Sequence, residues 1–112
     1  MVRTFAAIDV GSFELELGIF EISDKNGIRV VDHVKHMIAL GRDTFRDGKI
    51  SYRLVEETCG VLEDFVRIMK EYQVEDYRAY ATSAMREARN SQIVLEQIRV
   101  RTGIEVKIIS NS

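Results

Sequence analysis

The stretch that most constrains the fold of this chain runs from Phe5 to Phe20 and reads F-A-A-I-D-V-G-S-F-E-L-E-L-G-I-F. An apolar run ends at Asp9, and a turn that contains a glycine follows it. From Phe13 to Ile19 apolar residues then alternate with two glutamates and a glycine. A period of two over this length predicts a β-strand. The stretch therefore predicts a hairpin that carries a carboxylate at its bend.

Asp9 and Gly11 in this bend allow two interpretations. An aspartate can hold a metal ion or a water molecule, and a glycine lets backbone N–H groups come close to an anion. The same two residue types are also common in turns that have no further role. Spacing alone favours the ordinary turn, so a functional interpretation depends on the rest of the chain.

The first half of the chain predicts three consecutive antiparallel strands. The first hairpin covers about residues 4–22, and Asn26-Gly27 favours a tight turn into a third strand over residues 28–40. Residues 41–50 contain two glycines and mixed charges, and we expect a loop there. Ser51 is a good N-cap for the helix that follows.

The second half predicts alternating helices and strands. Apolar residues at helical spacing indicate an amphipathic helix over residues 52–72, with Cys59 as a small buried residue within it. Asn90 is a candidate cap for a later helix, and Gly103 stands where a helix commonly ends. The other segments are a strand at 77–81, helical segments at 84–89 and 93–100, and a last strand at 105–109.

The resulting order, β-β-β-α-β-α-β, predicts an α/β fold with one mixed five-stranded sheet and helices packed on it. The turn at Asp9 and the turn at residues 81–83 both follow the carboxyl end of a strand. Ligands of open α/β sheets usually bind at that edge. The two turns are therefore the candidate site.

Composition excludes several classes of function. The chain has 16 Lys and Arg against 18 Asp and Glu, so its net charge is −2 and predicts no general attraction to nucleic acid or membrane. The single cysteine excludes an internal disulfide and makes a cysteine-based metal site improbable. The first residues enter a strand without a signal-peptide pattern, which together with the cysteine usage predicts a cytoplasmic protein.

The segment Ala81 to Asn90, A-T-S-A-M-R-E-A-R-N, is the most specific stretch of the chain. It places two hydroxyl groups, on Thr82 and Ser83, at a strand-to-helix junction, with Arg86 in the first helical turn. A helix N-terminus attracts anions, and an arginine adds a two-pronged donor for phosphate oxygens. A helix cap beside a surface arginine is the simpler alternative, and such caps are common.

This segment resembles the A-T-S-A-hydrophobic-R-E-A-x-N motif of the exopolyphosphatase / guanosine pentaphosphate phosphohydrolase family, and A-A-I-D-V-G-S resembles the opening of that family. Further segments, A-L-G with D-G-K-I-S and T-G-I-E-V-K-I-I-S, resemble the family at matching spacing over nearly all 112 residues. The resemblance implies a ribonuclease-H-like (actin-like ATPase) subdomain with strand order 3-2-1-4-5. It also implies metal-assisted attack of water on a terminal phosphoanhydride of polyphosphate or guanosine pentaphosphate.

The resemblance also assigns residues to roles. Asp9 is expected at the catalytic metal and water, with Mg²⁺ or another divalent cation as cofactor. The expected phosphate-binding residues are Gly11, Ser12, Thr82, Ser83 and Arg86.

Two features of the sequence depart from the family pattern. Phe13 and Glu14 stand where the family has Asn and Ser, and a carboxylate 4 Å from a phosphate costs about 4 kcal/mol at an effective dielectric constant of 20. The family's catalytic Glu and second phosphate loop lie beyond the matched segments. We therefore expect residues 1–112 to be a single N-terminal actin-like subdomain without turnover of its own, completed by the remaining half-domain of a longer chain or by a homo-oligomer. The alternative is a non-catalytic regulatory or scaffolding module with the same fold.

Overall fold

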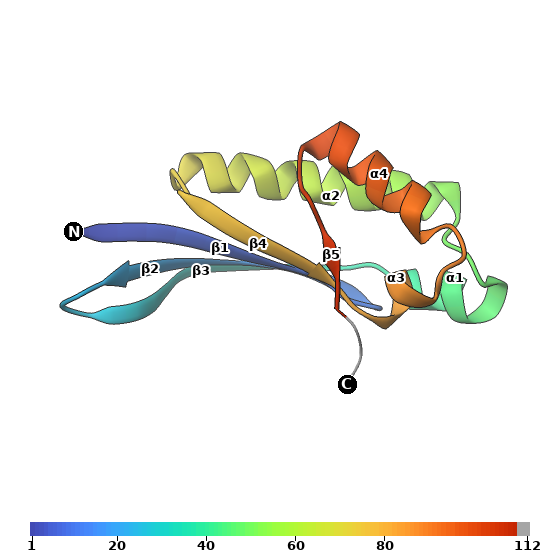
Figure 1. Cartoon of the computed structure of the whole chain (residues 1–112), viewed down its shortest axis with the longest axis horizontal. Coiled ribbons are helices and arrows are strands. Elements are labelled where there is room, and N and C mark those ends of the chain that lie inside the picture. Colours follow the sequence, from blue (N-terminus) through green and yellow to red (C-terminus); the bar gives the residue numbers. More distant parts are fainter. Residues whose placement is uncertain (110–112) are drawn as a thin grey trace.

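The computed structural model describes residues 1–109, which form five strands and four helices (Figure 1). None of these helices is long and apolar enough to span a bilayer. In chain order the elements are β1 (Val2–Val10), β2 (Glu14–Ser23), β3 (Gly27–Met37), α1 (Leu40–Asp47), α2 (Tyr52–Glu71), β4 (Asp76–Ala81), α3 (Ser83–Glu87), α4 (Ser91–Thr102) and β5 (Lys107–Ile108).

The five strands form one mixed sheet in the order β3-β2-β1-β4-β5, which confirms the predicted fold and strand order. The β1–β2 and β2–β3 pairs are antiparallel, whereas β4 lies parallel to both β1 and β5. In the β1–β4 pair, Asp9 lies opposite Tyr80 and Val10 opposite Ala81. The register therefore brings the two candidate turns to the same edge of the sheet.

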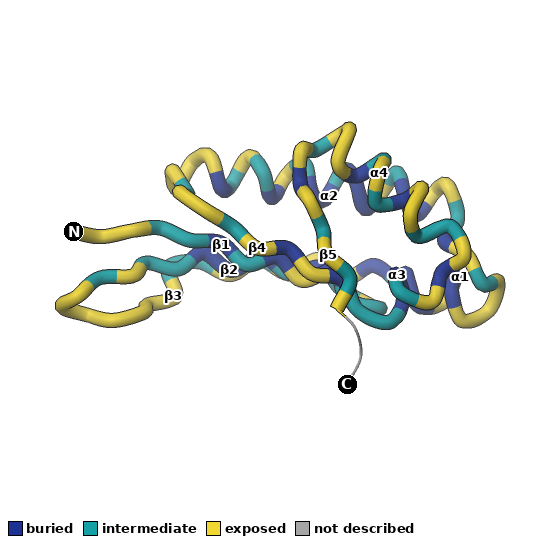
Figure 2. The backbone as a smooth tube through the Cα atoms, in the orientation of Figure 1, coloured by how far each residue is buried: buried dark blue, intermediate teal, exposed yellow. Residues whose placement is uncertain are grey.

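The core lies between the sheet and its helices. Alternate residues of β1 and β2 are fully buried beneath α2, and α4 packs against α2 above β4 and β5 (Figures 1 and 2). Helix α2 begins as predicted at Ser51, whose hydroxyl accepts a hydrogen bond from the Leu54 N–H at 3.4 Å. Cys59 is completely buried, as predicted. Its pKa is raised, mainly by this burial, so the thiol stays protonated as a core group.

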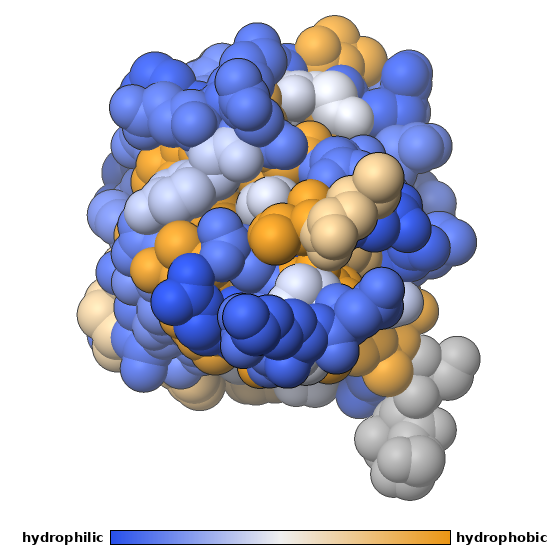
Figure 3. Space-filling model, turned by 90° about the vertical axis from the view of Figure 1, so that its left-hand side faces the viewer, coloured by the Kyte–Doolittle hydropathy of each residue, from blue (hydrophilic) through white to orange (hydrophobic). Residues whose placement is uncertain are grey.

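The opposite face of the sheet carries no helix within residues 1–109 (Figure 1). Asp9 alternates with the buried Ile8 and Val10, so its side chain belongs to this open face. Apolar surface is interspersed with polar surface at the end of the molecule where the β2–β3 turn lies (Figure 3). Exposed apolar side chains near that end include those of Val2, Ile22 and Ile28.

The predicted loop over residues 41–50 is wrong for its first part, because Leu40–Asp47 forms helix α1. The buried face of α1 consists of Leu40, Gly41, Asp43 and Thr44. Only one of these side chains is large and apolar, so hydrophobic periodicity did not indicate the helix. Gly48 ends α1 with a φ of 77°, a left-handed conformation in which glycine carries no steric penalty.

Two predicted details near the C-terminus also differ, and a third is confirmed. Asn90 occupies the N-cap position of α4 but makes no side-chain cap bond. Its amide instead accepts from the Ile50 N–H at 3.1 Å and donates to the Ile50 carbonyl at 2.9 Å, so it joins α4 to the loop before α2. The last strand is shorter than predicted and covers Lys107–Ile108. Gly103 ends α4 as predicted, with a φ of 80°.

Candidate functional site

The two candidate turns are joined by direct hydrogen bonds. The Thr82 N–H donates to the Val10 carbonyl at 3.2 Å, which extends the β1–β4 pairing into the second turn. The hydroxyl oxygens of Ser12 and Ser83 lie 3.1 Å apart and share a hydrogen bond. Residues 71 positions apart in sequence thus form one continuous edge.

The turn after β1 is held from both sides. The Gly11 N–H donates to the Glu14 carbonyl at 2.9 Å, and a Cβ at position 11 would lie only 3.0 Å from that oxygen, which explains the glycine. The Ser12 carbonyl accepts from the Gly41 N–H at 2.6 Å, and the Phe13 carbonyl accepts from the Ile38 N–H at 3.0 Å. Strand β3 and helix α1 therefore fix the conformation of this turn.

The turn after β4 leads into α3, which has only five residues. Thr82 stands at the N-cap position without a side-chain cap bond. The first N–H groups of a helix have no partner within the helix. Because α3 is so short, its dipole is weak, and the turn offers an anion mainly hydroxyl and N–H donors.

Arg86 makes two hydrogen bonds, one of which reaches the residue after β5. Its Nη1 donates to the Ile109 carbonyl at 3.0 Å, and its Nε donates to the Glu87 carboxylate at 3.1 Å. The guanidinium has five N–H donors, so others remain for a ligand. Arg86 thus holds the end of the last strand beside the two turns, and its predicted contact with phosphate stays a prediction.

Asp9 lies at the rim of a hollow of about 360 Å³ on the open face of the sheet. Glu16, which lies directly opposite Asp9 in the β1–β2 pair, and Thr82 also line this hollow. Partial burial raises the pKa of Asp9, and the negative charge of Glu16 raises it further. The Asp9 carboxylate is therefore an anion for which a nearby cation would be favourable.

Glu14 and Glu16 each have a cationic or potentially cationic partner on β3. Glu16 accepts a hydrogen bond from His33 at 2.8 Å, which is the main cause of its lowered pKa, and Glu14 lies 3.7 Å from the Lys35 amine. These partners reduce the negative potential near the turns. The repulsion between Glu14 and a phosphate is therefore smaller than the sequence alone predicts.

The side chains around Asp9 offer a divalent cation two carboxylates and not a complete set of ligands. No cluster of three metal-binding side chains occurs in the part of the chain that the structure describes. Asp9 and Glu16 provide two carboxylates on neighbouring strands. Mg²⁺ commonly binds through one or two carboxylates together with water and substrate phosphates, so this pair suits a cation that arrives with a phosphate.

Comparison with known proteins identifies the family. The model of the Ppx/GppA phosphatase family matches residues 19–112. The chain belongs to this family. Exopolyphosphatase 1 of Mycobacterium tuberculosis strain H37Rv is 28% identical to it over 102 residues, which cover 91% of this chain and 30% of that protein. The chain therefore spans about 30% of the length of the curated relatives that it matches.

Solved structures of Ppx/GppA proteins show the same fold. The Aquifex aeolicus family member superposes with a TM-score of 0.93 at 29% identity, over 97% of this chain and 35% of that chain. An exopolyphosphatase from Cytophaga hutchinsonii superposes with a TM-score of 0.90 at 25% identity, over 96% of this chain and 34% of that chain. These comparisons confirm the sequence-based resemblance and the actin-like fold.

The sequence did not identify the contacts that support the two candidate turns. The Thr44 hydroxyl donates to the Ala84 carbonyl at 2.8 Å and joins α1 to α3. Asp43 is 6% exposed, and its carboxylate accepts from the Ser51 N–H at 2.8 Å. Burial raises the pKa of Asp43, but bonds from Ser51 and the charges of Arg46 and Arg53 outweigh burial, so the pKa is lowered. The burial of Asp43 and Thr44 comes from tertiary packing, and nothing in the local sequence pattern signals it.

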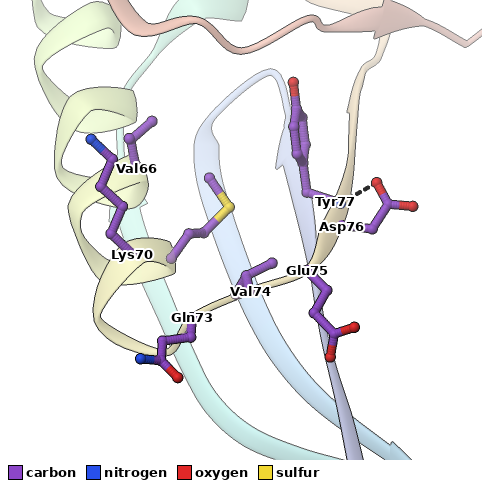
Figure 4. A pocket seen from close by; sticks show the side chains of 8 residues that line it. Val66, Lys70, Gln73, Val74, Glu75, Asp76 and Tyr77 are labelled. Carbon is purple, nitrogen blue, oxygen red and sulfur yellow. Dashed lines mark hydrogen bonds between the residues drawn. The ribbon is translucent and has the colours of Figure 1, made fainter.

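A larger hollow, of about 490 Å³, lies at the other end of the sheet (Figure 4). Its lining comes from the end of α2 and the start of β4, including Lys70, Gln73 and Tyr77 (Figure 4). None of the predicted site residues lines it. The candidate site is therefore defined by the meeting of the two turns and not by the largest of these hollows.

Proposed function

We propose that this chain forms the first phosphate-binding half of an exopolyphosphatase-type hydrolase. The observation that carries the proposal is the 3.1 Å contact between Ser12 and Ser83, which joins two hydroxyl-bearing turns beside Asp9. Membership in the Ppx/GppA family supports the substrate class. Polyphosphate and guanosine pentaphosphate both end in a phosphoanhydride, and either fits the proposal.

Each residue has a proposed role in binding. The Ser12, Thr82 and Ser83 hydroxyls donate to phosphate oxygens, and Gly11 keeps the first turn close to the anion. Arg86 retains its bond to Ile109 and presents a remaining donor to the phosphate. Asp9 and Glu16 hold a divalent cation such as Mg²⁺, which when bound neutralises phosphate charge and favours attack by water.

The proposal concerns binding rather than turnover by this chain. Because the chain spans about 30% of its curated relatives, the remaining catalytic groups are proposed to come from the rest of a longer chain or from a second subunit. We expect the 112-residue chain to release no phosphate from polyphosphate. Release that disappears in an Asp9→Asn variant would contradict this part of the proposal. A cytoplasmic location is also part of the proposal.

The test is a titration of the ¹⁵N-labelled chain with tripolyphosphate and Mg²⁺. We expect the amide signals of Ser12, Thr82 and Ser83 to shift, and the shifts to weaken in a Ser12→Ala, Ser83→Ala variant. Ser91→Ala, which removes a hydroxyl at the start of α4, is the matched control and should behave as the parent chain.

One observation favours a second function, that of a non-catalytic module. Phe13 follows Ser12 directly and its side chain is 54% exposed, so it places an apolar ring beside the turn. If the three amide signals do not move at any accessible concentration of tripolyphosphate, the scaffolding function replaces phosphate binding.

A further inference from the structure

A second charged hollow, of about 280 Å³, lies where β3 passes into α1 and faces the first turns of α2. We call it the arginine hollow. The charged side chains that line it are Arg42, Asp43, Arg46, Arg53 and Glu57. None of them belongs to the predicted site. The hollow thus collects guanidinium groups from two helices.

The arginines of the hollow are only partly neutralised. Arg46 lies 2.9 Å from the Asp47 carboxylate and 3.7 Å from that of Asp43. Arg42 and Arg53 form no ion pair within 4.0 Å among residues 1–109. Two guanidinium groups are therefore available to an anion that enters the hollow.

The two carboxylates of the hollow are already engaged. Asp43 is buried, and its carboxylate accepts a hydrogen bond from the Ser51 N–H. Glu57 lies 3.6 Å from the His36 ring. Arg46 is already paired with Asp43 and Asp47, so the cationic character of the hollow comes from Arg42 and Arg53. Planar guanidinium groups are the preferred partners of phosphate oxygens.

The arginine hollow is close to the paired turns along the backbone. Arg42 follows Gly41, whose N–H donates to the Ser12 carbonyl at 2.6 Å. A Cβ at Gly41 would lie 3.0 Å from the Ser12 Cβ, so α1 packs directly on the first turn. Helix α1 therefore contacts the first turn through Gly41 and lines the arginine hollow through Arg42.

We propose that the arginine hollow binds an internal phosphate of a polyphosphate chain whose terminal phosphate lies at the paired turns. The identity of the ligand rests on the proposed function. Arg42 and Arg53 supply the contacts, and Arg46 stays paired with its carboxylates. The hollow thereby favours a long phosphate chain over inorganic phosphate, which is too short to reach both places.

The test compares long-chain polyphosphate with inorganic phosphate on the ¹⁵N-labelled chain. Polyphosphate is expected to shift the side-chain Nε–Hε signals of Arg42 and Arg53, and inorganic phosphate is expected to leave them in place. An Arg42→Ala, Arg53→Ala variant should bind polyphosphate about tenfold more weakly. The matched control is Lys25→Ala, Lys70→Ala, which removes the same charge from exposed positions outside the hollow.

Circular dichroism of both double variants is the control that tests whether each is folded. Arginine signals that do not respond to polyphosphate would overturn the proposal, as would equal weakening in the lysine control, which indicates unspecific attraction. Arginine signals that shift while the Ser12 and Ser83 amides stay unchanged support binding of polyphosphate at the hollow, but contradict both the placement of the terminal phosphate at the paired turns and the proposed function. The reverse result supports the proposed function and contradicts the hollow.

Discussion

Helix α1 supports the candidate site through Thr44, and this can be tested by making the same substitution, threonine to valine, at Thr44 and at Thr58. Thr44 and Thr58 are both buried in helices, with side chains 4% and 1% exposed. The Thr44 hydroxyl donates to the Ala84 carbonyl at 2.8 Å, whereas the Thr58 hydroxyl has no hydrogen-bond partner among residues 1–109. Valine has the shape of threonine without the hydroxyl, and both side chains are β-branched, so helix propensity changes little.

The two substitutions should have opposite effects on the free energy of unfolding. Thr44→Val leaves the buried Ala84 carbonyl without this donor, and an unsatisfied buried polar group costs about 1–3 kcal/mol. Thr58→Val removes a hydroxyl that is itself unsatisfied, so it should stabilise the fold by about 1 kcal/mol.

Urea unfolding followed by circular dichroism measures both values, and an unchanged m-value shows that stability alone has changed. In addition, only Thr44→Val should shift the amide signals of Ser83 and Ala84, because only Thr44 contacts α3. Equal destabilisation by the two substitutions would refute the reasoning.

Three further predictions concern charge and backbone. The pKa of Asp9 is raised by burial and by Glu16, so Mg²⁺-dependent binding of tripolyphosphate should increase with pH above the ordinary range of an aspartate pKa. Glu16→Gln removes one of the two causes and should move this increase to lower pH. Titrations with tripolyphosphate at a series of pH values measure both effects. Asp43→Asn should destabilise the fold by about 1–2 kcal/mol near pH 7. The pKa of Asp43 is lower in the folded protein than in the unfolded chain, so its carboxylate stabilises the fold at pH values above the unfolded-state pKa. This stabilisation is lost as the pH falls through the folded-state pKa. Urea unfolding should therefore show that the stability difference between the parent chain and Asp43→Asn shrinks in acid. Gly11→Ala should destabilise by about 1 kcal/mol and shift the Glu14 amide, because the added Cβ lies 3.0 Å from the Glu14 carbonyl; unchanged stability would contradict the close approach.

The sequence predicted the first part of the sheet because residues 13–19 alternate with a strict period of two and the turns contain the expected residues. The alternation after Asp9 and the Asn26-Gly27 turn were sufficient for β1 to β3. Helix α1 was not predicted, since its buried face includes Gly41, Asp43 and Thr44 rather than a row of apolar side chains. Periodicity detects helices that bury apolar residues, and α1 buries polar ones.

The candidate site was predicted in outline for a different reason. Asp9 lies at the carboxyl end of β1, and Ser12 and Ser83 follow β1 and β4. The carboxyl ends of these parallel strands share an edge, and this rule of topology needs no coordinates. The partners of Arg86 and Asn90 could not be predicted, because each bonds to a backbone group more than 20 positions away in the chain. Local sequence favours a helix cap for Asn90 and a phosphate contact for Arg86, whereas tertiary packing supplies the distant backbone partners that the structure shows.

The central claim is that Asp9 holds a cation beside the paired turns. Mn²⁺ can replace Mg²⁺ as a paramagnetic probe, and nearby amide signals then broaden. In the presence of tripolyphosphate, we expect the amides of Val10 and Thr82 to broaden first in the parent chain and in the control Asp24→Asn, whose substitution lies in the distant β2–β3 turn. In Asp9→Asn this broadening should disappear. Equal broadening of the same amides in Asp9→Asn would contradict the claim.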